Sequence, residues 1–384
     1  MKRIAILGST GSIGVNTLKV ISHFPDRFRV IGLTTNSNIE LLSKQIKEFK
    51  PRFVCVSDNK AGFALRKKLN TANTKLFIGA QGLEALVSIK DIDKIVLAIS
   101  GAAALLPLLK ALERGKEVAL ANKEALVMAG PLIMDLARKK KTKIIPVDSE
   151  QSAIWQCLGE EPRSRLKHIY LTASGGPFRT VSPAALKSIS ISTVLRHPKW
   201  KMGKKISVDS ATLMNKGLEL LETMFLFGIP SEKIKILIHP QALIHSMVEF
   251  IDGIVLAQLS STDMRIPIQY ALSYPQRISN SLPVIDFYKL QELHFAKPDF
   301  KRFPCLNLAY RAARELGTMP CVLNAANEVV VSEFLGKRLG FISIPKVIER
   351  VMDRHRSKLS PHLSDILAAD KWAREEAYKA IRAI

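Results

Sequence analysis

The chain has 384 residues, of which 47% are hydrophobic and 24% are charged, and its formal net charge at pH 7 is +23. This length exceeds the usual size of one domain, so we expect two or three globular domains with substantial cores. The longest apolar run, residues 95–109, is interrupted by Ser100, Gly101 and Pro107 and is shorter than the ~20 residues of a membrane-spanning helix, so no membrane partner is expected.

The excess of positive charge raises the question of a nucleic-acid partner. The Lys and Arg residues are spread along amphipathic helices, however, and are not gathered with aromatic residues. The densest cluster, residues 138–143, lies where a helix is expected to end, and cations stabilise that end of a helix dipole. We therefore favour a small anionic substrate and expect no nucleic-acid partner.

The cysteines and the first residues bear on the cellular compartment. Cys55, Cys157, Cys305 and Cys321 are far apart and form no CxxC pair, so neither a zinc ribbon nor a dense disulfide framework is indicated. Residues 1–3 lead directly into an apolar segment and leave no room for a targeting peptide. The expected location is the cytoplasm.

Short apolar segments alternate with helical patterns from residue 1 to about residue 148. The expected strands are residues 3–7, 28–34, 53–56, 76–78, 94–99, 117–120 and 143–147, and the expected helices include 13–24, 39–49 and 123–139. This alternation is typical of a doubly wound, Rossmann-like parallel sheet, which binds ligands at the carboxyl ends of its strands.

The first strand is followed by Gly8, Gly11 and Gly14 in a GxxGxxG spacing that opens a helix. A dinucleotide pyrophosphate binds at a glycine-containing loop between a strand and a helix, although a tight strand-to-helix turn also explains these glycines. Residues 34–38, after the second strand, contain no carboxylate to receive the ribose hydroxyl of NAD, so NADP is favoured; they contain no Lys or Arg either.

Acidic residues follow two later strands. Glu124 comes after the sixth strand, and Asp148 and Glu150 come after the seventh. In an extended segment the side chains of Asp148 and Glu150 converge, and two such carboxylates repel unless a proton or a metal lies between them. Oxygen ligands suit Mg²⁺ or Mn²⁺. The alternative is a helix N-terminus that carries acidic residues.

A second α/β region with an open sheet is expected over residues 149–275. Its strands are residues 169–172, 234–238, 246–250 and 254–259. Ser174, in a glycine-containing turn after the first of these, is a candidate anion ligand. The basic segment 196–205 is expected to close over an anionic substrate with Trp200 as an apolar lid.

A helix is expected after residues 207–209, with Ser210 as its N-cap. Asn215 and Glu219 then lie one turn apart on one face, and Ser210, Asn215 and Lys216 offer donors for a phosphate beside the helix N-terminus. Glu219 lies too deep in the helix to interact with the N-terminal dipole, so it needs a cation or solvent. A capped amphipathic helix with a solvated polar stripe is the alternative.

Residues 276–303 are rich in Pro, Ser and Asn and are expected to form a linker. Helical patterns at 307–316, 322–335, 345–356 and 365–383 predict a small C-terminal helical bundle. The predicted organisation is therefore a dinucleotide-binding domain (1–148), a catalytic domain (149–275), a linker (276–303) and a helical domain (304–384).

Six segments, taken together and in this order, closely resemble the 1-deoxy-D-xylulose 5-phosphate reductoisomerase family over essentially the whole chain. They are GSTGSIG, LANKE, PVDSE, SGGPF, RHPKWKMGKKISVDSATLMNKGLE and LIHPQALIHSMV. The resemblance implies a homodimer that uses NADPH and Mg²⁺ or Mn²⁺ in the non-mevalonate isoprenoid pathway. It implies a skeletal rearrangement, by retro-aldol cleavage and re-addition or by an α-ketol shift, followed by hydride transfer to give 2-C-methyl-D-erythritol 4-phosphate.

The resemblance also implies roles for individual residues. The metal ligands are Asp148, Glu150 and Glu219, which form the catalytic set with Lys123 and His197. Substrate contacts come from Lys123, Ser149, Glu150, Ser174, His197, Trp200, Ser210, Asn215, Lys216 and Glu219, of which Ser174, Ser210, Asn215 and Lys216 match the phosphate site. Cofactor contacts come from Thr10, Gly11, Ser12, Ile13, Asn38, Asn122, Glu124 and Gly203.

One departure from the family concerns the cofactor, because some members have a basic residue where this chain has Ser37. Three other functions are weighed against the resemblance. A sugar-nucleotide epimerase needs a YxxxK pair, and no tyrosine here has a lysine four residues later. A semialdehyde dehydrogenase needs a cysteine nucleophile, and Cys157 is expected to be buried. A phosphate- or nucleic-acid-binding regulator needs no carboxylates, so it should tolerate Glu219→Gln.

Overall fold

The structure is a computed structural model that describes residues 1–68, 73–182, 185–196 and 203–383. Internal contacts divide the chain into two compact units: Met1–Ala125, Ile133–Ser152 and Asp263–Leu282 form the first, and Leu126–Leu132, Ala153–Thr262 and Pro283–Ile384 form the second. The predicted domain boundaries stay a prediction. Within the part of the chain that is described, none of the helices has the length and apolar character needed to cross a bilayer.

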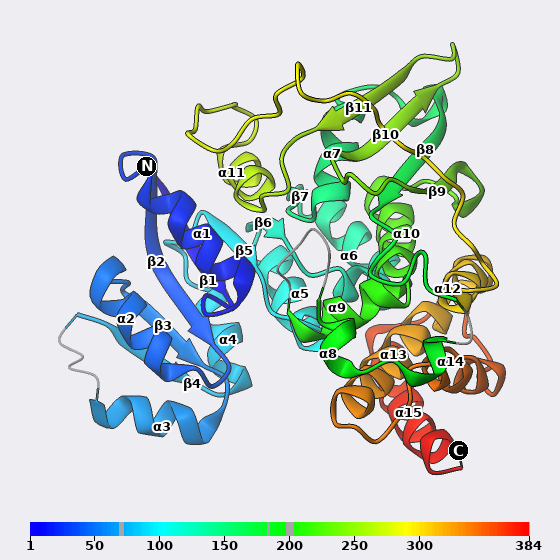
Figure 1. Cartoon of the computed structure of the whole chain (residues 1–384). Coiled ribbons are helices and arrows are strands. Elements are labelled where there is room, and N and C mark those ends of the chain that lie inside the picture. The colour runs from blue at the N-terminus through cyan, green and yellow to red at the C-terminus, as the bar shows by residue number, and fades with distance from the viewer. Residues whose placement is uncertain (69–72, 183–184, 197–202, 384) are drawn as a thin grey trace. The chain divides into compact units, whose positions relative to one another are not determined.

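The first unit is built on a seven-stranded sheet, blue to cyan in Figure 1. Every strand pairs in parallel, in the order β4-β3-β2-β1-β5-β6-β7. The strands are β1 (Lys2–Leu7), β2 (Phe28–Thr35), β3 (Phe53–Val56), β4 (Lys75–Ile78), β5 (Lys94–Leu97), β6 (Glu117–Leu120) and β7 (Ile144–Pro146). All seven predicted strands are present, so the expectation of a doubly wound parallel sheet is confirmed.

Helices follow the strands of this sheet. They are α1 (Ser12–Ser22), α2 (Ile39–Phe49), α3 (Asn59–Lys68), α4 (Ala80–Val87), α5 (Leu105–Glu113), α6 (Glu124–Lys139) and α7 (Ser149–Leu158). Parts of the last two, Leu126–Leu132 and residues 153–158, belong to the second unit. Strand residues such as Ile4, Ile6, Val54 and Val96 are completely buried in one hydrophobic cluster. Continuous apolar strands of this kind are typical of a parallel sheet that is covered on both faces.

Helix α11 (Arg265–Ser273) also belongs to the first unit, and no helix was predicted there from the sequence. It packs against α1, β6 and β7, and its Ile268 and Leu272 join the same hydrophobic cluster. Its C-terminal carbonyl groups accept hydrogen bonds from two lysines: Lys94 Nζ donates to Ala271 O at 2.7 Å, and Lys2 Nζ donates to Leu272 O at 3.3 Å. Ammonium groups stabilise this end of a helix.

The second unit contains the predicted open sheet, with four strands in the order β11-β10-β8-β9. Strand β8 (Leu166–Ala173) is antiparallel to β10 (Ile244–Phe250) and parallel to β9 (Ile234–Ile238), and β11 (Val255–Leu259) is an edge strand. Glu249 on β10 accepts hydrogen bonds from Tyr170 Oη at 2.6 Å and His168 Nδ1 at 3.0 Å and pairs with Lys167 at 2.8 Å.

The helices of the second unit include α8 (Ile191–Val194), α9 (Lys204–Ala211) and α10 (Met214–Phe227). The four predicted C-terminal helices are also present as α12 (Pro304–Glu315), α13 (Met319–Leu335), α14 (Ser343–Asp353) and α15 (Leu363–Arg382). Helix α13 packs against the other three and is buried along most of its length, so these helices form the expected bundle, orange to red in Figure 1. Residues 276–303 contain no helix or strand; residues 276–282 belong to the first unit and residues 283–303 to the second, and the expected linker stays a prediction.

Candidate active site

The glycine-containing loop between β1 and α1 lies at the carboxyl end of the first unit's sheet. Gly8 has a φ of +89°, and a Cβ atom on it would lie 2.6 Å from the carbonyl oxygen of Ala98, just after β5. Only glycine allows this close approach between the ends of β1 and β5, where the strand order reverses. Ligands of doubly wound sheets bind at this position.

The N-terminus of α1 faces the same loop. Its N-cap is Gly11, which has no side chain to occupy the first backbone N–H groups, and its first turn holds no acidic residue. Such a helix end attracts a phosphate. The predicted cofactor residues Gly11, Ser12 and Ile13 form this helix start, and Thr10 is held beside it by a 2.6 Å hydrogen bond between its Oγ1 and that of Thr35.

The other predicted cofactor residues have structural hydrogen bonds that the sequence did not reveal. Asn38 is the N-cap of α2, and its Oδ1 accepts a hydrogen bond from Leu41 N at 3.1 Å. Asn122 is buried and its Nδ2 donates to Glu124 Oε2 at 2.8 Å. Gly203 is the N-cap of α9, in the second unit.

Asp148 and Glu150 were expected to lie in an extended segment, and this prediction is wrong. Helix α7 begins at Ser149, because Ser152 N already donates a helical hydrogen bond to Asp148 O at 2.8 Å, and Glu150 therefore lies in the first helical turn. Lys123 Nζ lies 2.5 Å from Asp148 Oδ2, and Ser149 Oγ donates to Glu150 Oε2 at 2.5 Å. Both carboxylates thus have a close donor.

Glu219 is buried inside the second unit, where only 1% of its surface is exposed. A carboxylate in such a place needs a cation and hydrogen-bond donors. Lys216, one turn earlier on α10, forms an ion pair with Glu219 Oε2, and Asn215 Nδ2 donates to Glu219 Oε1 at 2.6 Å. The predicted placement of Asn215 and Glu219 on one helix face is confirmed.

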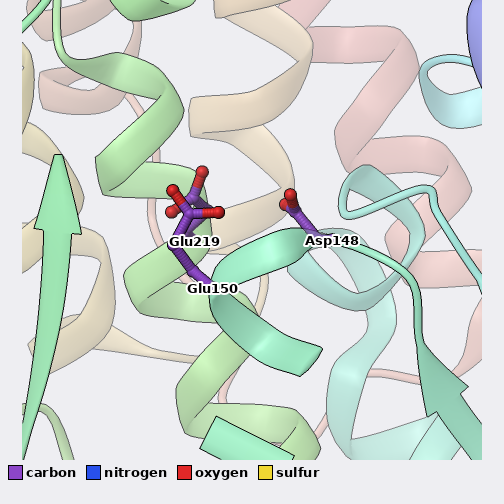
Figure 2. A group of neighbouring side chains, drawn as sticks. All are labelled: Asp148, Glu150 and Glu219. Atoms are coloured by element: carbon purple, nitrogen blue, oxygen red, sulfur yellow. The ribbon is translucent and has the colours of Figure 1, made fainter. Parts of the chain in front are cut away.

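The carboxylates of Asp148, Glu150 and Glu219 form a group in which one oxygen of each residue lies within 4.8 Å of the others (Figure 2). Asp148 and Glu150 are half-buried and Glu219 is buried. Three negative charges at this separation repel one another strongly, and a divalent cation relieves that repulsion. Because all three donors are carboxylate oxygens, the group fits Mg²⁺ or Mn²⁺ better than zinc.

Ser210 is not the N-cap that the sequence analysis expected. Residues 204–211 already form helix α9, so Ser210 lies in its last turn. The chain then breaks at Leu213, whose φ is +57°, and α10 starts at Met214 with Asn215 and Lys216 in its first turn. The break was missed because no glycine or proline marks it.

Ser174 lies just after β8, in the predicted glycine-containing turn. Gly175 and Gly176 both have positive φ values, of +87° and +65°. Gly176 N donates a 3.3 Å hydrogen bond to Ser174 Oγ. His197 and Trp200 lie outside the described residues, so the expected substrate contact and lid remain predictions.

Cys157 is half-buried and not fully buried as expected, and desolvation raises the pKa of its thiol to about 11, which disfavours a thiolate nucleophile near neutral pH. The semialdehyde dehydrogenase alternative therefore loses its candidate nucleophile.

The chain is similar to known proteins along its whole length. Residues 4–130 match the profile of a family described as 1-deoxy-D-xylulose 5-phosphate reductoisomerase. Residues 144–227 match the 1-deoxy-D-xylulose 5-phosphate reductoisomerase C-terminal domain, and residues 259–376 match the DXP reductoisomerase C-terminal domain.

Curated relatives named 1-deoxy-D-xylulose 5-phosphate reductoisomerase match nearly the whole chain. The relative from Thermoanaerobacter pseudethanolicus is 50% identical over 380 residues, which covers 99% of each chain. The relative from Thermodesulfovibrio yellowstonii is 49% identical and covers 99% of this chain and 100% of its own.

Solved structures of proteins with the same name are also similar to this chain. The Zymomonas mobilis enzyme in complex with NADPH has a TM-score of 0.93 and 42% identity, with full coverage of both chains. A DOX-P reductoisomerase in complex with NADPH, fosmidomycin and magnesium has a TM-score of 0.93 and 39% identity, and the match covers 100% of this chain and 98% of that one.

Proposed function

The chain belongs to the 1-deoxy-D-xylulose 5-phosphate reductoisomerase family, and we propose that it converts 1-deoxy-D-xylulose 5-phosphate to 2-C-methyl-D-erythritol 4-phosphate with NADPH and a divalent metal ion. The reaction supplies the non-mevalonate pathway to isoprenoid precursors. The observation that carries the proposal is the group of Asp148, Glu150 and Glu219, because a sugar-phosphate reductase without a metal has no need for three adjacent carboxylates.

NADPH supplies the hydride that reduces the rearranged aldehyde. Gly11, Ser12 and Ile13 bind its pyrophosphate through the N–H groups at the start of α1, and Thr10 lines the same turn. Asn38, Asn122, Glu124 and Gly203 complete the proposed cofactor contacts. The NADPH complex of the Zymomonas mobilis enzyme supports this cofactor.

Asp148, Glu150 and Glu219 would hold Mg²⁺ or Mn²⁺, and the bound ion polarises the ketone and hydroxyl oxygens of the substrate as a Lewis acid. Lys123 pairs with Asp148, so its ammonium group orients that carboxylate and neutralises part of the local charge. Ser149 donates to Glu150 and fixes the second carboxylate in the same way. In the proposed site Lys123 and Ser149 also contact the sugar oxygens, and His197 contacts the substrate.

The phosphate of the substrate binds to Ser174, Ser210, Asn215 and Lys216 in this proposal. Two of them, Asn215 and Lys216, lie in the first turn of α10, where backbone N–H groups and the helix dipole favour an anion. The structure of a relative with fosmidomycin supports a small phosphorylated ligand. The +23 net charge of the chain also favours an anionic substrate.

The test of this function is the oxidation of NADPH, followed by its absorbance. We expect oxidation only when both 1-deoxy-D-xylulose 5-phosphate and Mg²⁺ or Mn²⁺ are present. Mass spectrometry should identify the product as 2-C-methyl-D-erythritol 4-phosphate. A phosphonate with a hydroxamate arm should compete with the substrate. An unchanged rate after treatment with EDTA and desalting would remove the metal from the proposal.

We also propose that the chain forms a homodimer through the second unit. The edge strand β11 exposes Val255 and Leu256, each 46% exposed, and among the described residues no strand pairs with its outer backbone groups. Apolar side chains on an open sheet edge favour pairing with another chain. Sedimentation velocity should show a dimer, and Leu256→Lys should shift it toward the monomer. A monomeric wild-type protein at micromolar concentration would contradict this.

The proposed compartment is the cytoplasm. Cys55, Cys157, Cys305 and Cys321 are all free thiols, which suits a reducing environment. Fractionation of the producing cells, with the protein detected by antibody, tests this location.

A further inference from the structure

A buried carboxylate lies directly beside the proposed phosphate site and has no part in the chemistry described above. Asp209 on α9 is 1% exposed and precedes Ser210. Its Oδ1 accepts a 2.8 Å hydrogen bond from Asn327 Nδ2 on α13, and its Oδ2 pairs with Lys205 Nζ at 2.8 Å. Burying a charge is costly even when it is paired, so packing alone does not explain why an aspartate stands here.

The hydrogen bond from Asn327 ties α9 to the central helix of the C-terminal bundle. Asn327 is completely buried, and its own Oδ1 accepts no hydrogen bond from the residues that the structure describes. The bond to Asp209 is therefore the interaction that accounts for an amide side chain inside this helix. It joins two residues that are 118 positions apart in the sequence.

The turn that carries Ser174 rests on the same end of α9. A Cβ atom on Gly176 would lie 2.7 Å from the carbonyl oxygen of Ser210, and the φ of Gly176 is +65°. The backbone of this turn therefore lies in contact with Ser210, and Gly176 N donates to Ser174 Oγ. This contact couples the turn of Ser174 to the last turn of α9, which carries Ser210.

The junction to α10 is anchored to the backbone carbonyl groups at the end of α9. Thr212 Oγ1 donates to Val208 O at 3.1 Å and to Asp209 O at 3.2 Å, and it accepts a hydrogen bond from Met214 N at 3.3 Å. Leu213 between them has a left-handed backbone conformation, which a residue other than glycine adopts only when its surroundings hold it. The start of α10 therefore depends on the last turn of α9.

We propose that Asp209 is a positioning residue for substrate phosphate: through Asn327 it fixes the end of α9, and thereby Ser174, Ser210 and the start of α10, in the geometry that a phosphate requires. This inference rests on the proposed function, which assigns the phosphate to these residues. Lys205 also contributes to the phosphate site. Its ammonium group neutralises Asp209, whose charge would otherwise repel a phosphate dianion.

A positioning role is distinguished from a role in stability by comparing how each variant changes the affinity for the substrate and for NADPH. Asp209→Ala and Asn327→Ala should each raise the KM for 1-deoxy-D-xylulose 5-phosphate and the inhibition constant of a phosphonate hydroxamate by about tenfold, since each removes a buried hydrogen bond to a charged group. The dissociation constant of NADPH, measured by fluorescence titration, should stay unchanged. Asp209→Asn, which keeps the acceptor for Asn327, should show a smaller effect than Asp209→Ala.

Glu333→Gln is the matched control, because Glu333 is also a buried carboxylate of the second unit and is paired with Arg338. It should lower the unfolding temperature without changing the KM. If Asp209→Ala does not fold, Asn327→Ala decides the question. A normal KM in the folded variants, or an equal loss of substrate and NADPH affinity, would overturn the proposal, whereas absence of turnover by the wild type would overturn the proposed function.

Discussion

The ammonium group of Lys94 on β5 donates a 2.7 Å hydrogen bond to the carbonyl oxygen of Ala271 in the last turn of α11. Lys94 is 0% exposed, and burial lowers its pKa to about 8. The folded protein thus binds this proton less tightly than the unfolded chain does. Stability should therefore rise with pH between about 8 and about 10.5 and stay level, for this group, outside that range.

This gives the first prediction. The free energy of unfolding of the wild type, relative to Lys94→Met, should increase by up to about 3 kcal/mol between about pH 8 and about pH 10.5. Urea unfolding curves at several pH values measure this difference. Lys44→Met, at an exposed position on α2, should show no such trend. A difference that is independent of pH would mean that the ammonium group is solvated.

The second prediction concerns the carboxylate group. Glu219→Gln should weaken Mn²⁺ binding at least about tenfold, because it removes one of the three charged oxygen donors. Electron paramagnetic resonance of Mn²⁺ measures the free ion directly and does not depend on turnover. Glu113→Gln, on the surface of α5, is the control. Unchanged Mn²⁺ affinity in Glu219→Gln would exclude Glu219 from the ligand set.

The third prediction concerns stability in acid. Hydrogen bonds from Lys167, Tyr170 and His168 lower the pKa of Glu249 to about 2. The contribution of Glu249 to stability is therefore complete above about pH 4.5 and is lost as the pH falls toward about 2. The unfolding temperatures of the wild type and Glu249→Gln should converge over this range. Glu48→Gln, at an exposed position, should run parallel to the wild type throughout.

The fourth prediction concerns the choice of cofactor. Ser37 is exposed in the turn after β2, one residue before the N-cap of α2. An arginine there can pair with the 2′-phosphate of NADPH, so Ser37→Arg should raise the ratio of kcat/KM for NADPH to that for NADH by about tenfold. Ser22→Arg adds the same charge at the end of α1 and should leave the ratio unchanged. An unchanged ratio in Ser37→Arg would place the 2′-phosphate elsewhere.

The sequence predicted the parallel sheet well because its strands are buried on both faces and read as short, continuous apolar runs. Residues 53–56 are an example, since the predicted and observed strands have the same bounds. The pair of Asn215 and Glu219 was likewise predictable from helical spacing alone, because both ends of the interaction lie on one helix.

The features that the sequence did not reveal depend on distant partners. Helix α11 is short and contains Pro267, and it is held by Lys94 and Lys2, far away in the chain. The break at Leu213 has no local signal, because packing and the hydrogen bonds of Thr212 hold it. In the same way, nothing near Asp209 indicates that its partner is Asn327.

The position of α11 in the sequence affects when the first unit can complete its hydrophobic core during translation. The core of the first unit includes Ile268, Ala271 and Leu272, but the ribosome synthesises these residues only after the strands of the second unit. A nascent chain that ends near residue 152 therefore exposes an incomplete hydrophobic surface, and Lys94 lacks its acceptor. The hydrophobic core of the first unit is therefore completed only after more than a hundred further residues have been synthesised, and apolar surface that is exposed in the meantime is prone to aggregation.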